Sequence, residues 1–477
     1  MSLISIEFAA FVAIAAMLFQ FSPPRVRPAL LCVTSVVFCA LNSIAAAVAL
    51  IIATAIAFGA GRWIENTADE RRRRILLGAS IGILLGHLVL IKLIPDLTLP
   101  VWRGWLPEIL AAFGASYYTL KLVGYLVDVF WRRYPAWIDP VQFGAFATFF
   151  PLLPAGPIQR ANEFVWMAAD AEIAELMTHG LRRILLGLIK KLLVADRLGG
   201  LVDYVGAGQP EHANLIWVMA YLFPIQLYVD FSALSDIGIG VAALFGIRVP
   251  ENFAFPFFAS SIGEFWRRWH MSLTRWLRDY AFVALRMLTR TWGNAGIAIS
   301  IAVNMALIGM WHAITFGWLV FGLINAAFLI IEALTARVRR RIYAKRAWAS
   351  AIAGAVGPVL VFHMIAFSLV CFRAQTLPDI AYFFGNLCDG LNAPYTQLKQ
   401  LFYSYGRGPC TYDFAALSGF VLLDGGLYLR ARGWAPLSAL PGFGELPRAA
   451  RWAVYYLALV SVGIASHQSS SFIYVQF

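Results

Sequence analysis

Charged residues are scarce in this chain of 477 residues, in which Asp, Glu, Lys and Arg together make up only 13%. A soluble domain has roughly a quarter charged residues and a little under half apolar ones. Here 60% of the residues are hydrophobic and the mean hydropathy is +0.71. So few polar side chains would not cover a soluble particle. The composition excludes a soluble enzyme, a secreted disulfide scaffold and a disordered chain, and it indicates an all-α polytopic membrane protein.

Cysteine is also scarce, with five residues in the chain. Cys32, Cys39 and Cys371 lie within or at the ends of apolar runs, and no spacing is typical of a disulfide framework or a metal site. We therefore interpret the cysteines as packing residues and expect no metal and no bound cofactor. No fixed-period repeat and no soluble segment is visible, so residues 1–477 are predicted to form a single membrane-embedded domain.

Apolar runs of the length needed to span a bilayer, about 20 residues, recur along the chain. Residues 29–60 are long enough for a hairpin of two spans, because Asn42-Ser43 lies near the middle. The shorter pieces 143–153, 184–194 and 237–245 predict re-entrant or interfacial segments. In total we expect about eleven transmembrane helices. The remaining runs are 3–21, 75–93, 107–130, 214–229, 297–310, 316–334, 351–370, 414–429 and 452–465.

Positive charge exceeds negative charge by 12, and it lies in short clusters between the apolar runs. The clusters are Arg25 with Arg27, residues 71–74 and residues 337–346, the last with six Lys or Arg in ten residues. This distribution is typical of cytosolic loops and not of a nucleic-acid interface, so we expect membrane lipids and no nucleic acid as partners. It predicts that the N-terminus and the C-terminus both lie outside.

Polar residues at membrane depth are costly, so they mark candidate sites. The run YVDFSALSDIGIG begins at Tyr228 and contains Asp230 and Asp236. Residues 264–280 follow, with Arg268 and His270 among tryptophans. An amphipathic interfacial helix with snorkelling arginines explains most of this second stretch. It does not explain His270, which has no snorkelling role.

His312 ends an almost uninterrupted apolar run that also contains Asn304 and Trp311. A histidine inside a membrane helix is a candidate functional residue, because imidazole exchanges protons near neutral pH. A histidine satisfied within the core is the alternative. For the aspartates, the alternative to a role in the site is pairing with arginine or capping of broken helices.

Eight segments follow one another in a characteristic order: SYYTLKLVGYLVDV (116–129), FFPLLPAGPIQR (149–160), KLLVADRLGGLVD (191–203), YVDFSALSDIGIGVAALFGIRVPENFAFPF (228–257), EFWRRWHMSLTRWLRDY (264–280), GMWHAITFGW (309–318), VCFRAQTLPDI (370–380) and FIYVQF (472–477). In these segments the chain resembles the membrane-bound O-acyltransferase (MBOAT) family, in the bacterial branch that contains the alginate O-acetyltransferases. The resemblance implies an MBOAT fold, with re-entrant or interfacial helices around a central catalytic core whose motifs span about 114–380.

The resemblance also implies residue roles. The family's catalytic histidine maps onto His312, and its second histidine maps onto His270. Tyr474 matches a C-terminal aromatic motif of this branch, which makes it a candidate acetyl carrier; a membrane-interface anchor is the alternative. Asp230, Asp236, Asn304, Trp311 and Arg268 are candidate substrate-binding or orienting residues.

The activity that the resemblance implies is O-acetylation of a cell-surface polysaccharide from the bacterial cytoplasmic (inner) membrane. The donor would be a cytosolic thioester, acetyl-coenzyme A or an acyl-carrier protein, and a separate extracytoplasmic acetyltransferase would be the partner. Ala313 replaces the usual glycine, the glycine-rich basic segment after Tyr280 is missing, and Asn325 stands near the position of another family histidine. These departures leave other acceptors open, namely teichoic acid, peptidoglycan, a lipid or a protein. A multipass transporter is the alternative from another class.

Overall fold

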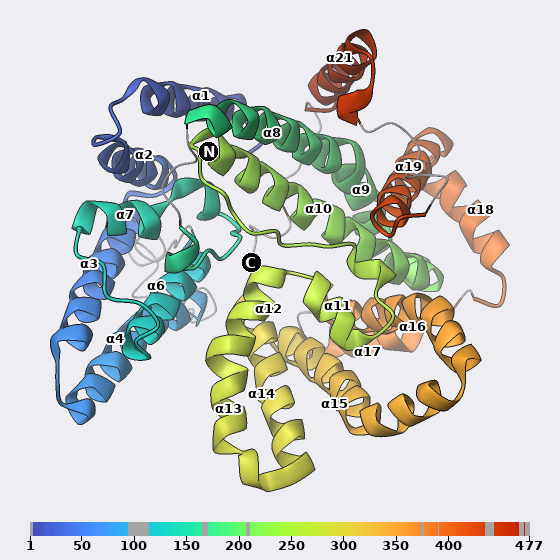
Figure 1. The fold of residues 1–477 in the computed structure, drawn as a ribbon. Coiled ribbons are helices and arrows are strands. Elements are labelled where there is room, and N and C mark those ends of the chain that lie inside the picture. Colours follow the sequence, from blue (N-terminus) through green and yellow to red (C-terminus); the bar gives the residue numbers. More distant parts are fainter. Residues whose placement is uncertain are drawn as a thin grey trace, which may run out of the picture. The chain divides into compact units, whose positions relative to one another are not determined.

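The computed structural model describes residues 3–93, 114–164, 170–206, 210–373, 376–389, 391–434, 443–466 and 472. Across these residues the regular structure is helical, with no strand (Figure 1). This confirms the all-α prediction. The chain divides into two compact units, each assembled from several chain segments. Because their segments interleave along the sequence, no single chain position separates them, and the prediction of one membrane domain stays a prediction.

The first unit comprises Met1–Ile184, Leu234–Glu251 and Arg275–Val283. The predicted break between two helices is present in it at Ser43, whose hydroxyl accepts a hydrogen bond from the amide of Ala46 at 3.2 Å and so caps the second helix. Of the two helices, only the second reaches the length of a span, so the hairpin of two spans stays a prediction. Its helices are α1 (Ile6–Phe21), α2 (Arg27–Asn42), α3 (Ile44–Asn66), α4 (Glu70–Leu93), α6 (Ala115–Phe130), α7 (Pro140–Thr148) and most of α8 (Asp170–Ile189).

The second unit comprises Leu185–Ala233, Asn252–Thr274 and Ala284–Phe477. In it α14 packs against α15, and α15 packs against α16, as Figure 1 shows. Its helices are α9 (Asp196–Gly206), most of α10 (Ile216–Leu244), α11 (Ile262–Arg268), the first part of α12 (Met271–Leu277), most of α13 (Val283–Leu288), α14 (Gly293–His312), α15 (Phe316–Lys345), α16 (Ala347–Arg373), α17 (Leu377–Asn386), α18 (Pro394–Ser404), α19 (Arg407–Ala431) and α21 (Arg448–Ala465).

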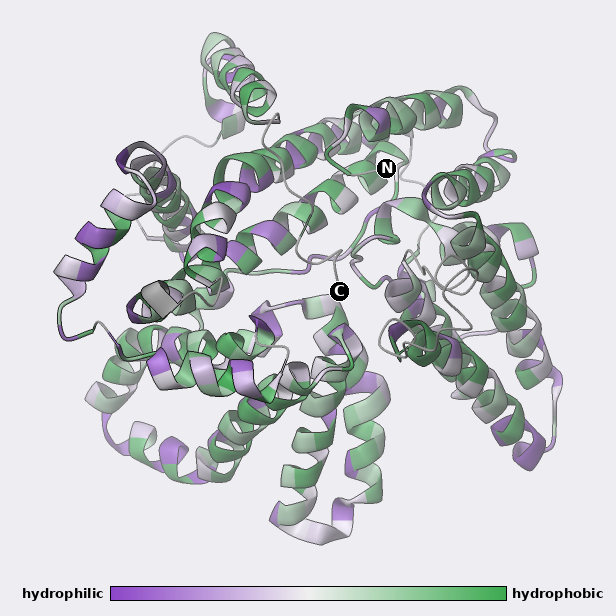
Figure 2. Cartoon of the chain, turned by 180° about the vertical axis from the view of Figure 1, so that it is seen from behind, coloured by the Kyte–Doolittle hydropathy of each residue, from purple (hydrophilic) through white to green (hydrophobic). Residues whose placement is uncertain are grey.

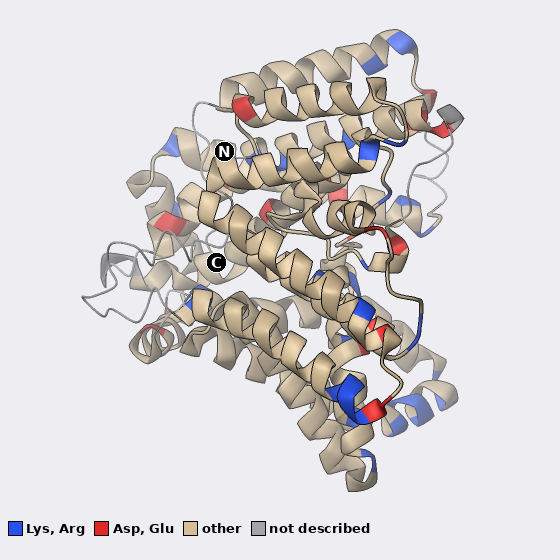
Figure 3. Cartoon of the chain, turned by 90° about the vertical axis from the view of Figure 1, so that its left-hand side faces the viewer, with Lys and Arg blue, Asp and Glu red and all other residues tan. Residues whose placement is uncertain are grey.

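Seven helices of the described residues are long and apolar enough to cross a bilayer. Figure 2 shows how hydrophobic they are, and Figure 3 shows charged residues mostly near helix ends. The number eleven stays a prediction, because α1 and α2 are shorter and residues 94–113 are outside the described part. The seven are Ile44–Asn66, Glu70–Leu93, Ala213–Leu244, Arg290–His312, Phe316–Lys345, Ala347–Arg373 and Arg407–Ala431.

Two segments differ from the sequence prediction. Residues 237–245 were expected to be a separate re-entrant piece, but residues 237–244 are the last two turns of the continuous helix α10. The basic cluster at 337–346 was expected to be a loop, but most of it is the last part of α15, which ends at Lys345. A helix that emerges from the bilayer keeps its backbone hydrogen bonds, so basic side chains do not require a loop.

Candidate active site

His312 is the last residue of α14 and belongs to the second unit. Only 8% of it is exposed. Its imidazole stacks on the indole of Trp318, with ring centroids 4.7 Å apart and planes inclined by 23°. Trp311 stands edge-on to it at 4.8 Å. The imidazole that ends this apolar run therefore packs against two tryptophans in a buried site.

His270 lies in the same unit, in the turn between α11 and α12, and is 1% exposed. Its φ of 41° is in the left-handed region, which few residues other than glycine adopt. Its ring centroid is 6.1 Å from that of His312 and 5.7 Å from that of Trp311. The two histidines, 42 positions apart in the sequence, thus meet in one aromatic cluster.

Asn252 holds the turn that carries His270. Its carbonyl oxygen accepts a hydrogen bond from the amide of Met271 at 2.8 Å, and its side-chain oxygen accepts one from the hydroxyl of Ser272 at 2.6 Å. Asn252 is fully buried. Strained backbone persists only where its surroundings fix it, and such strain is frequent at functional sites. The sequence prediction missed Asn252; its place in the segment 228–257, before the histidine turn, was the available signal.

Burial lowers the pKa of His270 to about 3, because the cluster removes the water that would solvate an imidazolium ion. The residue lies outside the membrane-spanning helices named above. A pKa this low keeps His270 neutral at physiological pH. A neutral imidazole still has one N–H group, so His270 can donate a hydrogen bond without carrying a charge.

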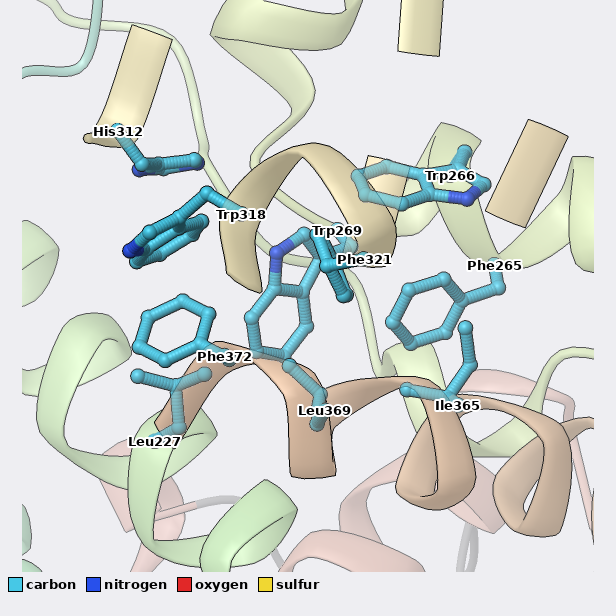
Figure 4. Close-up of a pocket in the computed structure, with 10 residues that line it drawn as sticks. All are labelled: Leu227, Phe265, Trp266, Trp269, His312, Trp318, Phe321, Ile365, Leu369 and Phe372. Carbon is cyan, nitrogen blue, oxygen red and sulfur yellow. The ribbon is translucent and has the colours of Figure 1, made fainter. Parts of the chain in front are cut away.

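A narrow pocket opens beside His312 (Figure 4). His312, Trp318 and Phe372 form one layered group of rings in this view, and Trp269 lies next to it. Almost every lining side chain is apolar, so the pocket offers few groups that compete for a proton. Its lining is Leu227, Phe265, Trp266, Trp269, His312, Trp318, Phe321, Ile365, Leu369 and Phe372.

The two predicted aspartates form ion pairs. Asp236 accepts a hydrogen bond from the guanidinium of Arg183 within the first unit. Asp230 accepts one from the ammonium of Lys191 at 2.8 Å within the second unit. Pairing with arginine was the alternative stated for Asp236, and the structure places it so. The sequence prediction missed Lys191, although a lysine within the family-like segment 191–203 was a usable signal.

The remaining predicted residues occupy three different settings. The Trp311 ring neighbours both histidines, with centroids 5.7 Å from His270 and 4.8 Å from His312. Asn304 lies two turns before His312 on α14, and its buried side-chain oxygen has no hydrogen-bond partner among the residues that the structure describes. Arg268 donates to the carboxylate of Glu264 at 2.5 Å. Tyr474 lies outside the described residues.

Comparison with known proteins gives the family. The model of the membrane-bound O-acyltransferase family matches residues 133–374, which include both histidines. The chain is 34% identical over 278 residues to the probable alginate O-acetylase AlgI of Pseudomonas aeruginosa, covering 57% of this chain and 50% of the relative.

Two further relatives have different names. Over 304 residues the chain is 26% identical to the peptidoglycan O-acetyltransferase of Helicobacter pylori, covering 57% of this chain and 55% of that protein. Over 316 residues it is 26% identical to the teichoic acid D-alanyltransferase of Bacillus subtilis, covering 63% of this chain and 78% of that protein. The chain spans about half the length of the alginate O-acetylases that it matches. The family model matches half of this chain, and several of its helices are able to span a membrane. The chain therefore belongs to the membrane-bound O-acyltransferase family.

Proposed function

We propose that this protein is an O-acyltransferase that takes an acetyl group from a cytosolic thioester, acetyl-coenzyme A or an acyl-carrier protein, for O-acetylation of a cell-surface polysaccharide. One observation carries the proposal: in a chain of the O-acyltransferase family, the His270 and His312 rings lie 6.1 Å apart in one buried aromatic cluster. The relatives named as alginate and peptidoglycan O-acetylating proteins favour acetyl as the group and a polysaccharide as the acceptor.

The chemistry assigns one role to each histidine. His312 accepts the proton of the attacking hydroxyl, and the oxygen attacks the thioester carbonyl carbon. His270 donates its N–H to the oxyanion that forms, a role suited to a neutral imidazole with a pKa of about 3. The intermediate collapses with cleavage of the carbon–sulfur bond, and the proton on His312 passes to the thiolate. The apolar pocket wall keeps water from competing with the acceptor hydroxyl.

The first acceptor in this proposal is the phenol of Tyr474. Its oxygen forms an ester with the acetyl group, and the ester then passes the group to a hydroxyl of an extracytoplasmic acetyltransferase, so that the phenol regains its proton. A phenol, with a pKa of about 10, is a better leaving group than a sugar hydroxyl, so two transfers replace one difficult transfer. Phe472, two residues earlier in the sequence, is buried, which supports a tail that enters the protein.

The test uses the full chain in membrane vesicles supplied with acetyl-coenzyme A carrying a labelled acetyl group. His312→Ala is expected to slow thioester consumption at least about a hundredfold, because a positioned base contributes roughly 10²–10⁴-fold. His363→Ala is the matched control, since that histidine lies on α16 with an exposed ring bonded to the carbonyl of Val359 at 2.7 Å. Wild-type consumption in His312→Ala would refute the proposal, and a transporter would consume no thioester at all.

Tyr474→Phe separates the acetyl carrier from a membrane-interface anchor. It keeps the ring and removes only the oxygen. The acetyl-carrier role predicts loss of the labelled C-terminal peptide in mass spectrometry and loss of polysaccharide acetylation at a normal protein level. Normal acetylation in Tyr474→Phe would leave only the anchor.

A further inference from the structure

Lys191 is a charged residue that the chemistry above does not use. It is 1% exposed, and its ammonium donates to Asp196 at 2.7 Å and to Asp230 at 2.8 Å. A buried ammonium is stable only when it is paired, and these two carboxylates supply that pairing. All three residues belong to the second unit. The ion cluster is thus built to keep a positive charge inside the protein.

A third side of the ammonium faces an aromatic ring. The centroid of the Phe472 ring lies 4.6 Å from the Lys191 nitrogen, and Phe472 is 3% exposed. A cation within about 6 Å of a ring centroid is attracted to the face of the ring, most strongly where both are removed from water. Phe472 is not part of a helix. The Lys191 ammonium therefore contacts the C-terminal segment at Phe472.

The backbone at Lys191 has an unusual form. Residues Lys190–Ala195 form a π-helical turn between α8 and α9, and the amide of Asp196 bonds to the carbonyl of Lys191. The wider turn brings residues five positions apart onto one side, so the Asp196 carboxylate reaches the Lys191 ammonium. π-Helical turns are rare in proteins as a whole, but those that occur are often found at functional sites. The local fold is thus shaped to place the ammonium.

Ala465 and Phe472, seven positions apart in the sequence, both lie near this cluster. Ala465, the last residue of α21, lines a cavity together with Asp196, and the same carboxylate bonds to Lys191. Phe472, seven positions later, contacts the ammonium itself. The cavity also has polar groups from Arg197, Tyr405 and Asp413. The end of α21 and Phe472 accordingly both lie beside the Lys191 cluster.

We propose that the Lys191 ammonium, held by Asp196 and Asp230, is a binding site for the ring of Phe472 that positions the C-terminal tail and with it Tyr474. The inference rests on the proposed acetyl-carrier function of Tyr474. Lys191 is a positioning residue here, because it acts through the tail. A cation–ring contact biases the tail toward the docked state by about tenfold to thirtyfold. That bias holds the tail at the site and still allows it to leave and pass the acetyl group on.

The experiment measures hydrogen–deuterium exchange of the C-terminal peptide in the full chain, purified in detergent. Phe472→Met keeps an apolar side chain and removes the ring, and it is expected to speed exchange about tenfold. Phe472→Trp keeps a ring that attracts a cation more strongly, so its exchange should be no faster than that of the wild type. Lys191→Arg should also protect the tail, because it keeps the cation.

Lys190→Met tests whether the effect is specific to the ammonium over the ring. It removes a neighbouring positive charge that bonds to Ser232 at 3.3 Å, so the tail should exchange at the wild-type rate. Exchange at the wild-type rate in Phe472→Met would overturn the inference, and so would equal acceleration in Phe472→Trp. These outcomes do not depend on Lys191→Met, which leaves two buried carboxylates unpaired and risks unfolding.

Acetylation measured in the same variants separates the two proposals. Faster exchange in Phe472→Met together with weaker acetylation supports both. Faster exchange in Phe472→Met, together with normal acetylation in Tyr474→Phe, retains the binding site and refutes the acetyl carrier. Unchanged exchange in Phe472→Met with acetylation lost in Tyr474→Phe retains the carrier and refutes the binding site.

Discussion

The buried histidine His270 makes the protein sensitive to acid in a way that can be calculated. Burial lowers its pKa from an ordinary 6.5 to about 3. Between these values the unfolded chain binds a proton that the folded chain does not, so the free energy of unfolding falls as the pH falls below 6.5. The stabilisation is fully present above pH 6.5. Lowering the pH from 7.5 to 5 should cost about 2 kcal/mol, at roughly 1.4 kcal/mol per unit of pH below 6.5.

The assay compares unfolding of the detergent-purified wild type and His270→Gln at pH 7.5 and pH 5. Other groups also titrate in this range, but they do so in both proteins, so the difference between the proteins isolates His270. We expect the wild type to lose about 2 kcal/mol more than His270→Gln. His363→Gln, which removes an exposed histidine, should behave like the wild type. Equal losses in wild type and His270→Gln would show that His270 is not buried as a neutral ring.

Two further predictions concern the histidine turn and the topology. Asn252→Leu should lower stability by about 1–3 kcal/mol and should slow acetyl transfer, because it removes the acceptor of the Ser272 hydroxyl. Ser272→Ala should lose less of both, because it leaves the Asn252 side-chain oxygen bonded to the amide of residue 272 at 3.4 Å. Thermal unfolding and thioester consumption measure the two effects, and equal activity in both variants would contradict the positioning role. An impermeant thiol reagent should label a cysteine introduced at Gln375 from outside and one at Gly433 only from the cytosolic side, as the basic clusters predict; equal labelling of both would refute this topology.

The sequence predicts helices well where local chemistry decides them. The break between α2 and α3 is an example, because a serine that caps a helix marks it at Ser43. It failed at α10, where the polar stretch from Asp230 to Asp236 suggested an interruption. The helix continues because Lys191 and Arg183 pair with these carboxylates from 39 and 53 positions away in the chain. No local pattern reports such partners.

The candidate site shows the same division. The motifs single out His270 and His312 as chemically unusual, and the structure brings their rings together. The turn at Asn252 and the stacking of Trp318 on His312 depend on contacts between separate helices, so residue types and spacing do not reveal them. Two glycines, which the sequence analysis did not single out, decide how closely α14 and α15 approach each other.

The last prediction concerns these glycines, Gly309 on α14 and Gly322 on α15. A Cβ atom added at Gly322 would lie 2.5 Å from the carbonyl oxygen of Met305, and one at Gly309 would collide with the carbonyl of Trp318. The two backbones thus touch where a larger residue would separate them. Gly309 is one turn before His312, and Trp318 carries the ring on which His312 stacks. The glycine contact therefore sets the position of the catalytic candidate.

Gly309→Ala should push α14 away from α15 and lower stability by about 1–3 kcal/mol, as overpacking does. Acetyl transfer should fall further than stability implies, by about tenfold to a hundredfold, because a displacement of about 1 Å in a reacting group has effects of that size. Gly354→Ala on α16 is the matched control, since its added Cβ would meet nothing within 4 Å. It should keep wild-type activity and lose no stability, because alanine favours helix over glycine. If Gly309→Ala has the same stability and the same rate of acetyl transfer as Gly354→Ala, the close approach of the two helices does not position His312.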